Sequence, residues 1–254
     1  MIDIHCHILP GLDDGAQTIE DSLAMARAAV NDGITKIVAT PHHQTSRFMN
    51  PKNVVLEKVA YVNEAIEQAG LPLEVLLGQE VRLFGEWEAE FDANQLATVN
   101  NGNYILIEFP SNHVPNYAER LFYEMQMKGL TPVIVHPERN SQIVQQPEKL
   151  YTLIEKGAIS QVTASSVAGD LGKKLQKFSF QLIEANLTHC VASDAHNTTI
   201  RPFMMSKAYD VIEKEFGIDV VYMFRENAEY IITSQMIYRE DPQQVKRKKI
   251  LGLF

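Results

Sequence analysis

Short segments rich in valine and isoleucine alternate with longer amphipathic segments along almost the whole chain. This alternation predicts parallel strands, each followed by a helix that packs against the sheet. A chain of 254 residues with no strong linker fits one large α/β barrel-type domain, which we place at residues 1–240, with a basic tail at 241–254. The predicted strands span residues 2–7, 35–40, 73–78, 104–107, 131–135, 158–163 and 188–192.

Helices are predicted between these strands from their apolar spacing and their end signals. Thr18 is a suitable N-cap, Ile19 and Leu23 begin an apolar stripe, and Gly33 ends the first helical segment. Residues 81–103 are less regular and predict only a short hairpin or helix. The predicted helices span residues 18–32, 51–70, 115–128, 147–157, 168–185, 202–216 and 219–232.

The composition is that of an ordinary soluble globular protein, with 45% hydrophobic and 22% charged residues. A formal net charge of −9 argues against nucleic acid as the main partner, because proteins that bind nucleic acid usually carry a basic face. No apolar run approaches the roughly 18 residues of a membrane span, and we recognise no signal peptide. We therefore expect a cytoplasmic protein that is not itself a membrane protein.

Two further features bear on the cellular setting. Cys6 and Cys190 both lie in apolar, strand-like runs and predict buried, reduced thiols rather than a disulfide. The tail carries a basic run at 246–249, which we interpret as solvated. Docking of that run to an acidic partner or a membrane surface is the alternative.

Residues able to bind metal follow six of the seven predicted strands. His5 and His7 are spaced i, i+2, so their side chains share one face of the first strand and can close on one ion. Functional residues of βα barrels lie where strands end and loops begin, so these side chains should gather at one mouth. Many ionisable groups in one place are costly without a compensating charge, which favours a metal centre. The candidate ligands are His5, His7, Asp14, His42, Glu80, Glu108, His136, Asp194 and His196.

These candidates comprise five imidazoles and four carboxylates, with no cysteine. That mixture suits Mn²⁺, Fe²⁺, Zn²⁺ or Co²⁺, and it does not exclude Mg²⁺. Nine ligands are too many for one ion and fit two or three. Three divalent ions would outweigh the charge of the carboxylates and leave a positive site suited to a phosphate dianion and a hydroxide.

Two arginines accompany the candidate ligands. Arg139 and Arg201 follow the fifth and seventh predicted strands. A guanidinium group can donate to two phosphate oxygens at once, so both are candidate catalytic residues. The alternative for each is an exposed arginine that forms an ordinary ion pair.

Other polar residues near the strand ends are candidates for alternative or supporting roles. Asp13 is an alternative to Asp14 as a ligand. His43 is predicted to support the loop or the ligands from behind, and His113 is a candidate to line the cleft. His189 lies early in its strand, away from the mouth, and is predicted to be structural.

Motifs at these strand ends resemble those of the PHP (polymerase and histidinol phosphatase) superfamily over nearly the whole chain. The N-terminal stretch IDIHCHILPGLDDG and the later segment HPERN are similar to the bacterial metal-dependent protein-tyrosine phosphatases of capsule and exopolysaccharide loci. The motifs are His5-Cys6-His7, Thr40-Pro41-His42, Gly78-Gln79-Glu80, Ile107-Glu108-Phe109, His136-Pro137-Glu138-Arg139 and Ser193-Asp194-Ala195-His196.

This resemblance implies a distorted, TIM-like (β/α)7 barrel with three metal ions, usually taken as Mn²⁺. It also implies that the substrate is phosphotyrosine on a cognate, membrane-associated bacterial tyrosine kinase, whose dephosphorylation tunes capsular and exopolysaccharide synthesis. Asp14 is preferred to Asp13 on the same ground. The implied ligand sets are His5, His7, Glu80 and Asp194 for the first ion; Glu80, Glu108 and His136 for the second; and Asp14, His42 and His196 for the third.

The cysteines test this interpretation against the cysteine-dependent tyrosine phosphatases. Those enzymes need a reactive thiolate with an arginine six positions later. The residues six positions after Cys6 and Cys190 are Leu12 and His196, so neither cysteine fits. We therefore expect a metal-activated hydroxide to attack phosphorus in line, with no phosphocysteine intermediate. Arg139, with Arg201 as the second candidate, is expected to stabilise the equatorial oxygens.

Three alternatives remain open from the sequence. The same centre could hydrolyse a small phosphomonoester such as histidinol phosphate. It could cleave phosphodiesters, as PHP exonuclease modules do, although the acidic charge and single-domain length count against a nuclease. A metal-dependent, non-enzymatic module that binds a membrane kinase is the third alternative.

Overall fold

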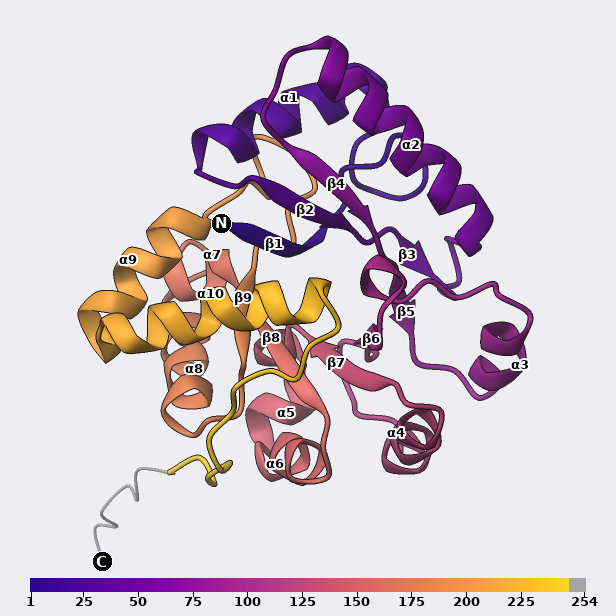
Figure 1. The fold of residues 1–254 in the computed structure, drawn as a ribbon. Coiled ribbons are helices and arrows are strands. Elements are labelled where there is room, and N and C mark those ends of the chain that lie inside the picture. The colour runs from indigo at the N-terminus through magenta and orange to yellow at the C-terminus, as the bar shows by residue number, and fades with distance from the viewer. Residues whose placement is uncertain (247–254) are drawn as a thin grey trace, which may run out of the picture.

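The computed structural model describes residues 1–246, so most of the basic run at 246–249 lies outside the described residues. Strands and helices alternate as the sequence predicts (Figure 1). The strands are β1 (Ile2–Cys6), β2 (Lys36–Ala39), β3 (His42–His43), β4 (Glu74–Leu77), β5 (Glu80–Arg82), β6 (Tyr104–Glu108), β7 (Thr131–Val135), β8 (Ile159–Thr163) and β9 (Cys190–Ala192). The helices are α1 (Ile19–Asn31), α2 (Lys52–Gln68), α3 (Trp87–Asp92), α4 (Ala118–Met127), α5 (Ser141–Gln145), α6 (Glu148–Glu155), α7 (Ala164–Ala168), α8 (Lys173–Glu184), α9 (Met205–Phe216) and α10 (Ile218–Ile232), with short 3-10 helices η1 (Val99–Asn101) and η2 (Pro137–Arg139).

All paired strands run parallel, in two sheets with the orders β1-β2-β4 and β3-β5-β6-β7-β8-β9. The two sheets arise because one pair of strands is interrupted part-way. Ala39 pairs with Leu77 before the interruption, and His42 pairs with Glu80 after it, in the same register. Pro41 has no N–H to donate to the ladder, although its carbonyl accepts the Glu80 N–H at 3.1 Å. The second and third predicted strands therefore each continue as a second, shorter strand.

The first and last strands lie next to each other. Cys6 and Ala195 form an isolated parallel bridge. The buried Asp3 carboxylate accepts hydrogen bonds from the Ser193 N–H at 2.9 Å and the Ser193 hydroxyl at 2.5 Å. The strands nevertheless do not form one continuous hydrogen-bonded ladder, so the closed seven-stranded sheet that we predicted is not formed as such. The fold is mixed α/β with parallel sheets.

A bulge in β1 changes which face its residues occupy. Asp3 pairs with Ile37 and Cys6 pairs with Ala39, so β1 uses one residue more than β2 over this stretch. Strict alternation would place Ile4 and Cys6 on the same face. Instead, Ile4 packs in the inner apolar cluster and Cys6 packs in the outer one, between strands and helices. The bulge thus separates Cys6 from the interior just before the strand ends.

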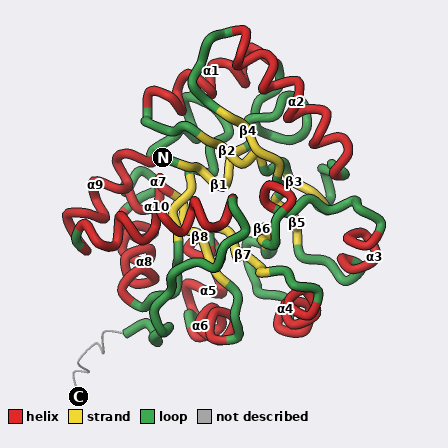
Figure 2. The backbone as a smooth tube through the Cα atoms, viewed as in Figure 1, coloured by secondary structure: helices red, strands yellow, loops and turns green. Residues whose placement is uncertain are grey.

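The apolar core has two layers, and the helices lie outside the strands (Figure 2). The inner cluster combines strand residues such as Leu106 and Val133 with Ala228 and Ile231 of α10, all essentially inaccessible to solvent. In Figure 1, α10 crosses in front of β8 and β9. The polar residues that follow the strands gather at one end of the sheets, because all paired strands are parallel and their carboxyl ends lie together.

Most predicted helices are confirmed, and the differences have local causes. Thr18 and Asp21 form a capping box at the start of α1. The helix predicted over 168–185 is confirmed as α8, but it begins only at Lys173, because Gly169 and Gly172 adopt φ values of +89° and +97°. The short helix α7 that precedes these glycines was not predicted. The irregular segment 81–103 contains most of β5, then α3 and η1. Among residues 1–246, no helix is both long enough and apolar enough to cross a membrane.

Candidate metal centre

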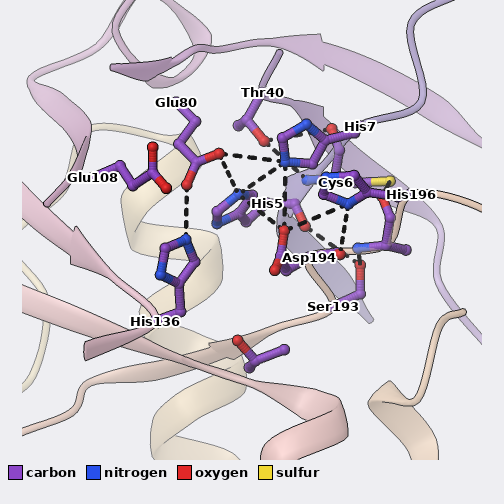
Figure 3. Close-up of polar contacts among 12 residues, drawn as sticks. His5, Cys6, His7, Thr40, Glu80, Glu108, His136, Ser193, Asp194 and His196 are labelled. Carbon is purple, nitrogen blue, oxygen red and sulfur yellow. Dashed lines mark hydrogen bonds and ion pairs between the residues drawn. The ribbon is translucent and has the colours of Figure 1, made fainter. Parts of the chain in front are cut away.

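Four side-chain atoms from three separate strand ends form a compact cage (Figure 3). His5 Nε2 and His7 Nε2 lie 3.3 Å apart. Each of them lies 3.4–3.5 Å from Glu80 Oε2 and from Asp194 Oδ1. Ligand atoms about 2.1 Å from a tetrahedral ion are separated from one another by about 3.4 Å. The cage therefore has the dimensions of a metal site before any ion is considered.

Glu80 links this cage to a second group of side chains. Its Oε1 atom lies 2.8 Å from His136 Nε2, and its Oε2 atom lies 2.7 Å from His42 Nδ1. Glu108 Oε2 lies 3.9 Å from the same His42 nitrogen and 2.8 Å from Arg82 Nη2. One fully buried carboxylate thus contacts imidazoles from both sides, as expected of a bridging ligand.

A third group surrounds Asp14. Its Oδ1 atom lies 3.5 Å from both His42 Nε2 and His196 Nε2. Potential ligand atoms of His7, Asp14, His42 and His196 all lie within 4.8 Å of one another. The structure therefore brings all nine sequence-predicted ligands into one continuous cluster at the carboxyl ends of the strands.

Several buried polar atoms of this cluster have no hydrogen-bond partner in the described part of the chain. They are His42 Nδ1, Glu80 Oε2, Glu108 Oε2 and His196 Nε2. The close approaches of His42 to Glu80 and of Arg82 to Glu108 are ion-pair contacts that do not meet hydrogen-bond geometry. Buried polar atoms are nearly always paired in native proteins, so an unpaired set needs an explanation. Divalent cations would pair all of them, and the donor set of imidazoles and carboxylates suits such ions.

The electrostatics of the cluster also suit cations. Burial alone would raise the pKa of Glu80, but His42 and His5 hold it well below its usual range. Burial would likewise raise the pKa of Asp194, and His7 and His5 keep it low. Burial and the nearby His7 lower the pKa of His196 to about 4. Ionised carboxylates and neutral imidazoles are the protonation states that bind metal. Burial would lower the pKa of His5, His7 and His42, but the carboxylates beside them raise it, so metal binding would release protons from these three histidines.

Glu108 differs from the other carboxylates. Its burial and the neighbouring Glu80 charge raise its pKa. Two buried carboxylates side by side repel each other unless a positive charge separates them. This pair therefore gives a further electrostatic reason for a cation between them.

The comparisons with known proteins agree with this site. A family model described as "Capsular polysaccharide synthesis, CpsB/CapC" matches residues 1–233. This chain belongs to the CpsB/CapC family. It is 53% identical to the tyrosine-protein phosphatase YwqE of Bacillus subtilis (strain 168) over 254 residues, which covers all of both chains. It is 31% identical to the tyrosine-protein phosphatase CpsB of Streptococcus agalactiae serotype III over 243 residues, covering 93% of this chain and 100% of that one.

Solved structures give the same result. A structure described among "YwqE from Bacillus subtilis and CpsB from Streptococcus pneumoniae, unique metal-dependent tyrosine phosphatases" matches with a TM-score of 0.95 and 53% identity. The match covers 97% of this chain and 100% of that chain. A mutant organophosphorus hydrolase from Deinococcus radiodurans, at 13% identity and a TM-score of 0.54, shares only the fold. The predicted resemblance to metal-dependent tyrosine phosphatases of capsule loci is confirmed at the level of the family.

Two residues support the histidines from behind: Asp13, which the sequence offered only as an alternative ligand, and Gln161, which it did not single out. Asp13 Oδ2 lies 2.6 Å from His7 Nδ1 and also accepts the His42 N–H at 3.0 Å. Gln161 Oε1 lies 3.1 Å from His5 Nδ1. Partners of this kind fix the tautomer and ring orientation of a ligating histidine. Asp13 therefore lies behind His7, which favours Asp14 as the ligand. The signal in the sequence that could have identified Gln161 was a glutamine inside a strand that is otherwise apolar enough to be buried.

We expect Asp13→Asn to lower metal affinity by about 10- to 100-fold, because loss of a partner behind a ligand typically costs that much. An amide can still accept the Gly15 N–H, so the loop should keep its shape. Metal titration followed by elemental analysis measures the effect. Asp170→Asn is the control, because Asp170 is exposed and bonds only to Lys207 and its own turn. Unchanged metal affinity in Asp13→Asn would contradict a supporting role.

Both candidate arginines reach the edge of the cluster. Arg139 Nη1 and Arg201 Nη2 bond to the same oxygen, Asp194 Oδ2, the latter at 2.7 Å. They also line a cavity of about 450 Å³ together with apolar residues that include Leu171 and Ile200. The two arginines are therefore neither isolated nor merely exposed. Each lies between a buried carboxylate and an open cavity.

The remaining histidines lie outside the cluster. The buried His43 contacts Glu90 at 3.1 Å and accepts the Asn50 N–H, so it supports a loop. His113 is exposed and bonds to its neighbour Asn112, so its predicted place in the cleft gains no support. His189 lies just before β9, at the far end of that strand, as predicted. Phe48, which was not predicted, stacks on His42 with ring centroids 5.9 Å apart.

Cys6 is placed beside the cluster but faces away from it. Its side chain is fully buried in the outer apolar cluster, and its thiol donates weakly to the Ala195 carbonyl. Burial raises the pKa of this thiol well above its usual value, and burial likewise raises the pKa of Cys190. Neither cysteine is available as a thiolate at neutral pH.

Cys6→Ala is therefore expected to leave the turnover number within about threefold of wild type while lowering stability by about 1 kcal/mol, since it removes one small buried group. Steady-state kinetics on a phosphotyrosine peptide and urea unfolding provide the two measurements. A loss of turnover without a loss of bound metal would reopen the case for a cysteine nucleophile.

Proposed function

We propose that this chain removes phosphate from phosphotyrosine by a metal-dependent hydrolysis. It is a metal-dependent tyrosine phosphatase of the CpsB/CapC type. The observation that carries the proposal is the nine-residue cluster with two arginines at its edge. The tyrosine-protein phosphatases YwqE and CpsB align with 100% and 93% of this chain, at 53% and 31% identity. Similarity over this length supports the same reaction here.

The cluster would hold three divalent ions, with Mn²⁺ as the expected metal. His5, His7, Glu80 and Asp194 would hold the first, and Glu80 would extend to a second with Glu108 and His136. Asp14, His42 and His196 would hold the third. Bound ions would supply a nucleophilic hydroxide at neutral pH and would neutralise charge on the phosphoryl oxygens.

The protein's own groups would position the phosphate. Arg139 and Arg201 each use one donor on Asp194, and Arg201 Nη1 also lies 3.9 Å from Asp14 Oδ2. A guanidinium carries several N–H donors, so each arginine would still have donors to offer to phosphoryl oxygens. Asp194 fixes where the guanidinium groups lie, so they need not reorganise as charge develops. The cluster contains no dedicated acid for the leaving group. A phenol, with a pKa of about 10, leaves without protonation far more easily than an aliphatic alcohol.

The cavity beside the arginines offers a place for the tyrosine ring. Asn197 Oδ1 accepts the backbone N–H groups of Thr199, Ile200 and Arg201 at 3.0, 2.7 and 3.0 Å, which makes a rigid loop. That loop presents Ile200, 84% exposed, on the wall of the cavity. An exposed isoleucine on an ordered loop next to phosphate-binding donors suits an aromatic ring rather than a short serine side chain.

Ile200→Ala is expected to raise KM for a phosphotyrosine peptide by about tenfold, because the loss of a few methylene contacts in a pocket is typically worth that much. The turnover number should change little, because Ile200 does not touch the reacting atoms. Ile218→Ala, another exposed isoleucine, on the far side of the fold, is the matched control. An unchanged KM would argue against ring binding at this wall.

The biological setting that we propose is based on membership of the family. The substrate would be a tyrosine-phosphorylated, membrane-associated bacterial kinase and its targets, and the reaction would regulate capsular and exopolysaccharide synthesis in the cytoplasm. Residues 1–240 would act as one catalytic domain. We also retain the distorted (β/α)7 barrel as the interpretation of the fold, supported by the strand register that resumes after Pro41 and by the bridge between Cys6 and Ala195.

One experiment tests the proposed activity. Rates are measured on a phosphotyrosine peptide, a phosphoserine peptide and histidinol phosphate, with the metal-loaded protein, after chelation, and after return of Mn²⁺. We expect the phosphotyrosine peptide to be preferred, chelation to abolish turnover and Mn²⁺ to restore it. A clear preference for histidinol phosphate would favour a small-molecule phosphatase, and full activity in excess chelator would overturn the metal mechanism.

A further inference from the structure

The loop at residues 44–50, which joins β3 to α2 (Figure 1), borders the metal centre. Phe48 in this loop stacks on the candidate ligand His42, with the ring centroids 5.9 Å apart and the ring planes 10° apart. The Arg47 guanidinium lies over the Phe48 ring, with its Cζ atom 5.1 Å from the ring centroid. A cation at this distance from the face of an aromatic ring is attracted to it. The loop therefore holds one positive charge beside the metal centre, on an aromatic support.

Hydrogen bonds hold this loop in one conformation. The Thr45 N–H donates to the Phe48 carbonyl at 3.2 Å. The Thr45 hydroxyl oxygen accepts the N–H groups of Arg47 and Phe48 at 3.3 and 2.9 Å. The Asn50 amide donates to the Leu12 carbonyl at 2.8 Å, which joins the loop to the first of the segments that supply metal ligands. The position of the Arg47 backbone is thus fixed relative to the centre.

The positive charge of Arg47 has no ion-pair partner within 4.0 Å in the described part of the chain. The side chain is exposed, and the loop itself contains no acidic residue. Glu90 of the neighbouring helix α3 is engaged by His43, at 3.1 Å, and by Gln44. In a chain with a net charge of −9, an ordered and unpaired arginine next to the centre is available to an anionic group from outside.

Arg47 is placed to meet a residue that flanks the phosphotyrosine rather than the phosphate itself. The two ring separations together put its guanidinium within about 11 Å of the His42 ring, which about three residues of extended chain span. It forms no ion pair with any of the nine candidate ligands. Arg139 and Arg201, in contrast, both bond to Asp194. Those two arginines therefore serve the phosphate, and Arg47 lies farther out.

A carboxylate is the anionic group that a peptide most commonly offers at such a distance. The planar guanidinium can donate two parallel N–H bonds to the two oxygens of a carboxylate. Stacking on Phe48 uses the face of the guanidinium and leaves these N–H donors at its edge available. An exposed charge at the edge of a binding site acts mainly on association and on discrimination between partners. A lysine at the same place in a substrate would be repelled.

We propose that Arg47, held on Phe48, is a specificity-determining residue that binds an acidic side chain near the phosphotyrosine of the substrate. This inference rests on the proposed phosphatase function and adds a class of substrate to it. The preferred sites carry aspartate or glutamate within about three residues of the phosphotyrosine. Phe48 acts as a positioning residue, because it holds the guanidinium in place and does not itself contact the acidic group.

Three phosphotyrosine peptides test this inference with the whole, metal-loaded chain. They differ only at the three positions on each side of the phosphotyrosine, which are all glutamate, all glutamine or all lysine. Free phosphotyrosine, which has no flanking residues, is the reference substrate, and kcat/KM is measured for each. We expect kcat/KM for the glutamate peptide to exceed that for the lysine peptide by about tenfold at low salt, and the ratio to fall as salt screens the charge.

Substitutions at Arg47 then locate the preference. Arg47→Gln is expected to remove most of it, and Arg47→Glu is expected to favour the lysine peptide over the glutamate peptide. The side chain is exposed, so both variants should fold. Arg27→Gln, which removes an exposed arginine of α1, is the matched control and should keep the wild-type preference. An undiminished preference for glutamate in Arg47→Glu would overturn the proposal.

The reference substrate separates the remaining outcomes. If Arg47→Gln lowers the rate on free phosphotyrosine as much as the rate on the glutamate peptide, then Arg47 contacts the reacting phosphoryl group and the proposal is wrong. Equal turnover of the three peptides by the wild type would overturn this inference and leave the phosphatase function standing. No turnover of any phosphotyrosine substrate would overturn both.

Discussion

Replacing Glu80 with glutamine is expected to lower turnover of a phosphotyrosine peptide by at least about 100-fold, since even residues behind metal ligands typically cost 10- to 100-fold. Glu80 is fully buried, and its two oxygens lie within 3.5 Å of nitrogen atoms from four histidines. An amide retains the size of the side chain but presents one oxygen and no charge. The variant would lose the bridge between the first and second ion sites and should hold fewer ions per chain.

Metal content by elemental analysis and steady-state kinetics measure the two effects on the same sample. Glu74→Gln is the matched control, because Glu74 begins the preceding strand segment and pairs only with the exposed Lys36 at 3.0 Å. The control should keep its metal and its activity. Wild-type metal content with unchanged turnover in Glu80→Gln would contradict the bridging role of Glu80.

The thermal stability of the protein should depend on whether this cluster holds metal ions. Five histidines and four carboxylates meet in a small volume, and part of this set stays without hydrogen-bond partners. Ions that bind only the folded chain stabilise it by mass action. Bound ions would therefore raise the thermal stability of the folded chain, and melting curves before and after chelation measure the difference.

The positions of the ligands could be predicted because of one general property of parallel sheets. Residues that follow successive parallel strands meet at the same end of the sheet, however far apart they are in sequence. His5, near the end of β1, illustrates this, because its Nε2 atom lies 3.5 Å from both Glu80 Oε2, which follows β4, and Asp194 Oδ1, which follows β9. Residue type and strand position were sufficient to place these candidates, whereas Asp14 was preferred to Asp13 only because of the family resemblance.

Features that depend on local backbone irregularity could not be predicted in this way. The bulge that separates Ile4 from Cys6 has no mark in the sequence, and the interruption at Pro41 is visible only as a single proline. Asp13 and Gln161 support histidines from positions that are fixed by loop shape and by strand pairing. Position at the end of a strand identifies side chains that point into the metal centre, whereas Asp13 and Gln161 lie behind the histidines that do so.

The role of Arg139 is the sharpest test of how the site acts on phosphate. Arg139 and Arg201 both bond to Asp194, so the arginines could bind the substrate or could simply hold a metal ligand in place. These roles have different kinetic consequences. Donors to a phosphoryl group act mainly in the transition state, and the loss of one such donor lowers the turnover number by about 100- to 1,000-fold. Loss of a support for Asp194 would instead lower the amount of bound metal.

We expect Arg139→Ala to show the first pattern, with the turnover number reduced and the metal content retained. Arg139→Lys restores the charge but not the paired N–H donors, so it should recover only part of the rate. Arg120→Ala removes an exposed arginine of α4 that pairs with Glu124 and should behave as wild type. If Arg139→Ala instead loses metal and regains full turnover at high Mn²⁺, then Arg139 positions Asp194 and does not bind the phosphoryl group. Because the remaining arginine can still hold Asp194, the single variant separates the two roles more cleanly than removal of both would.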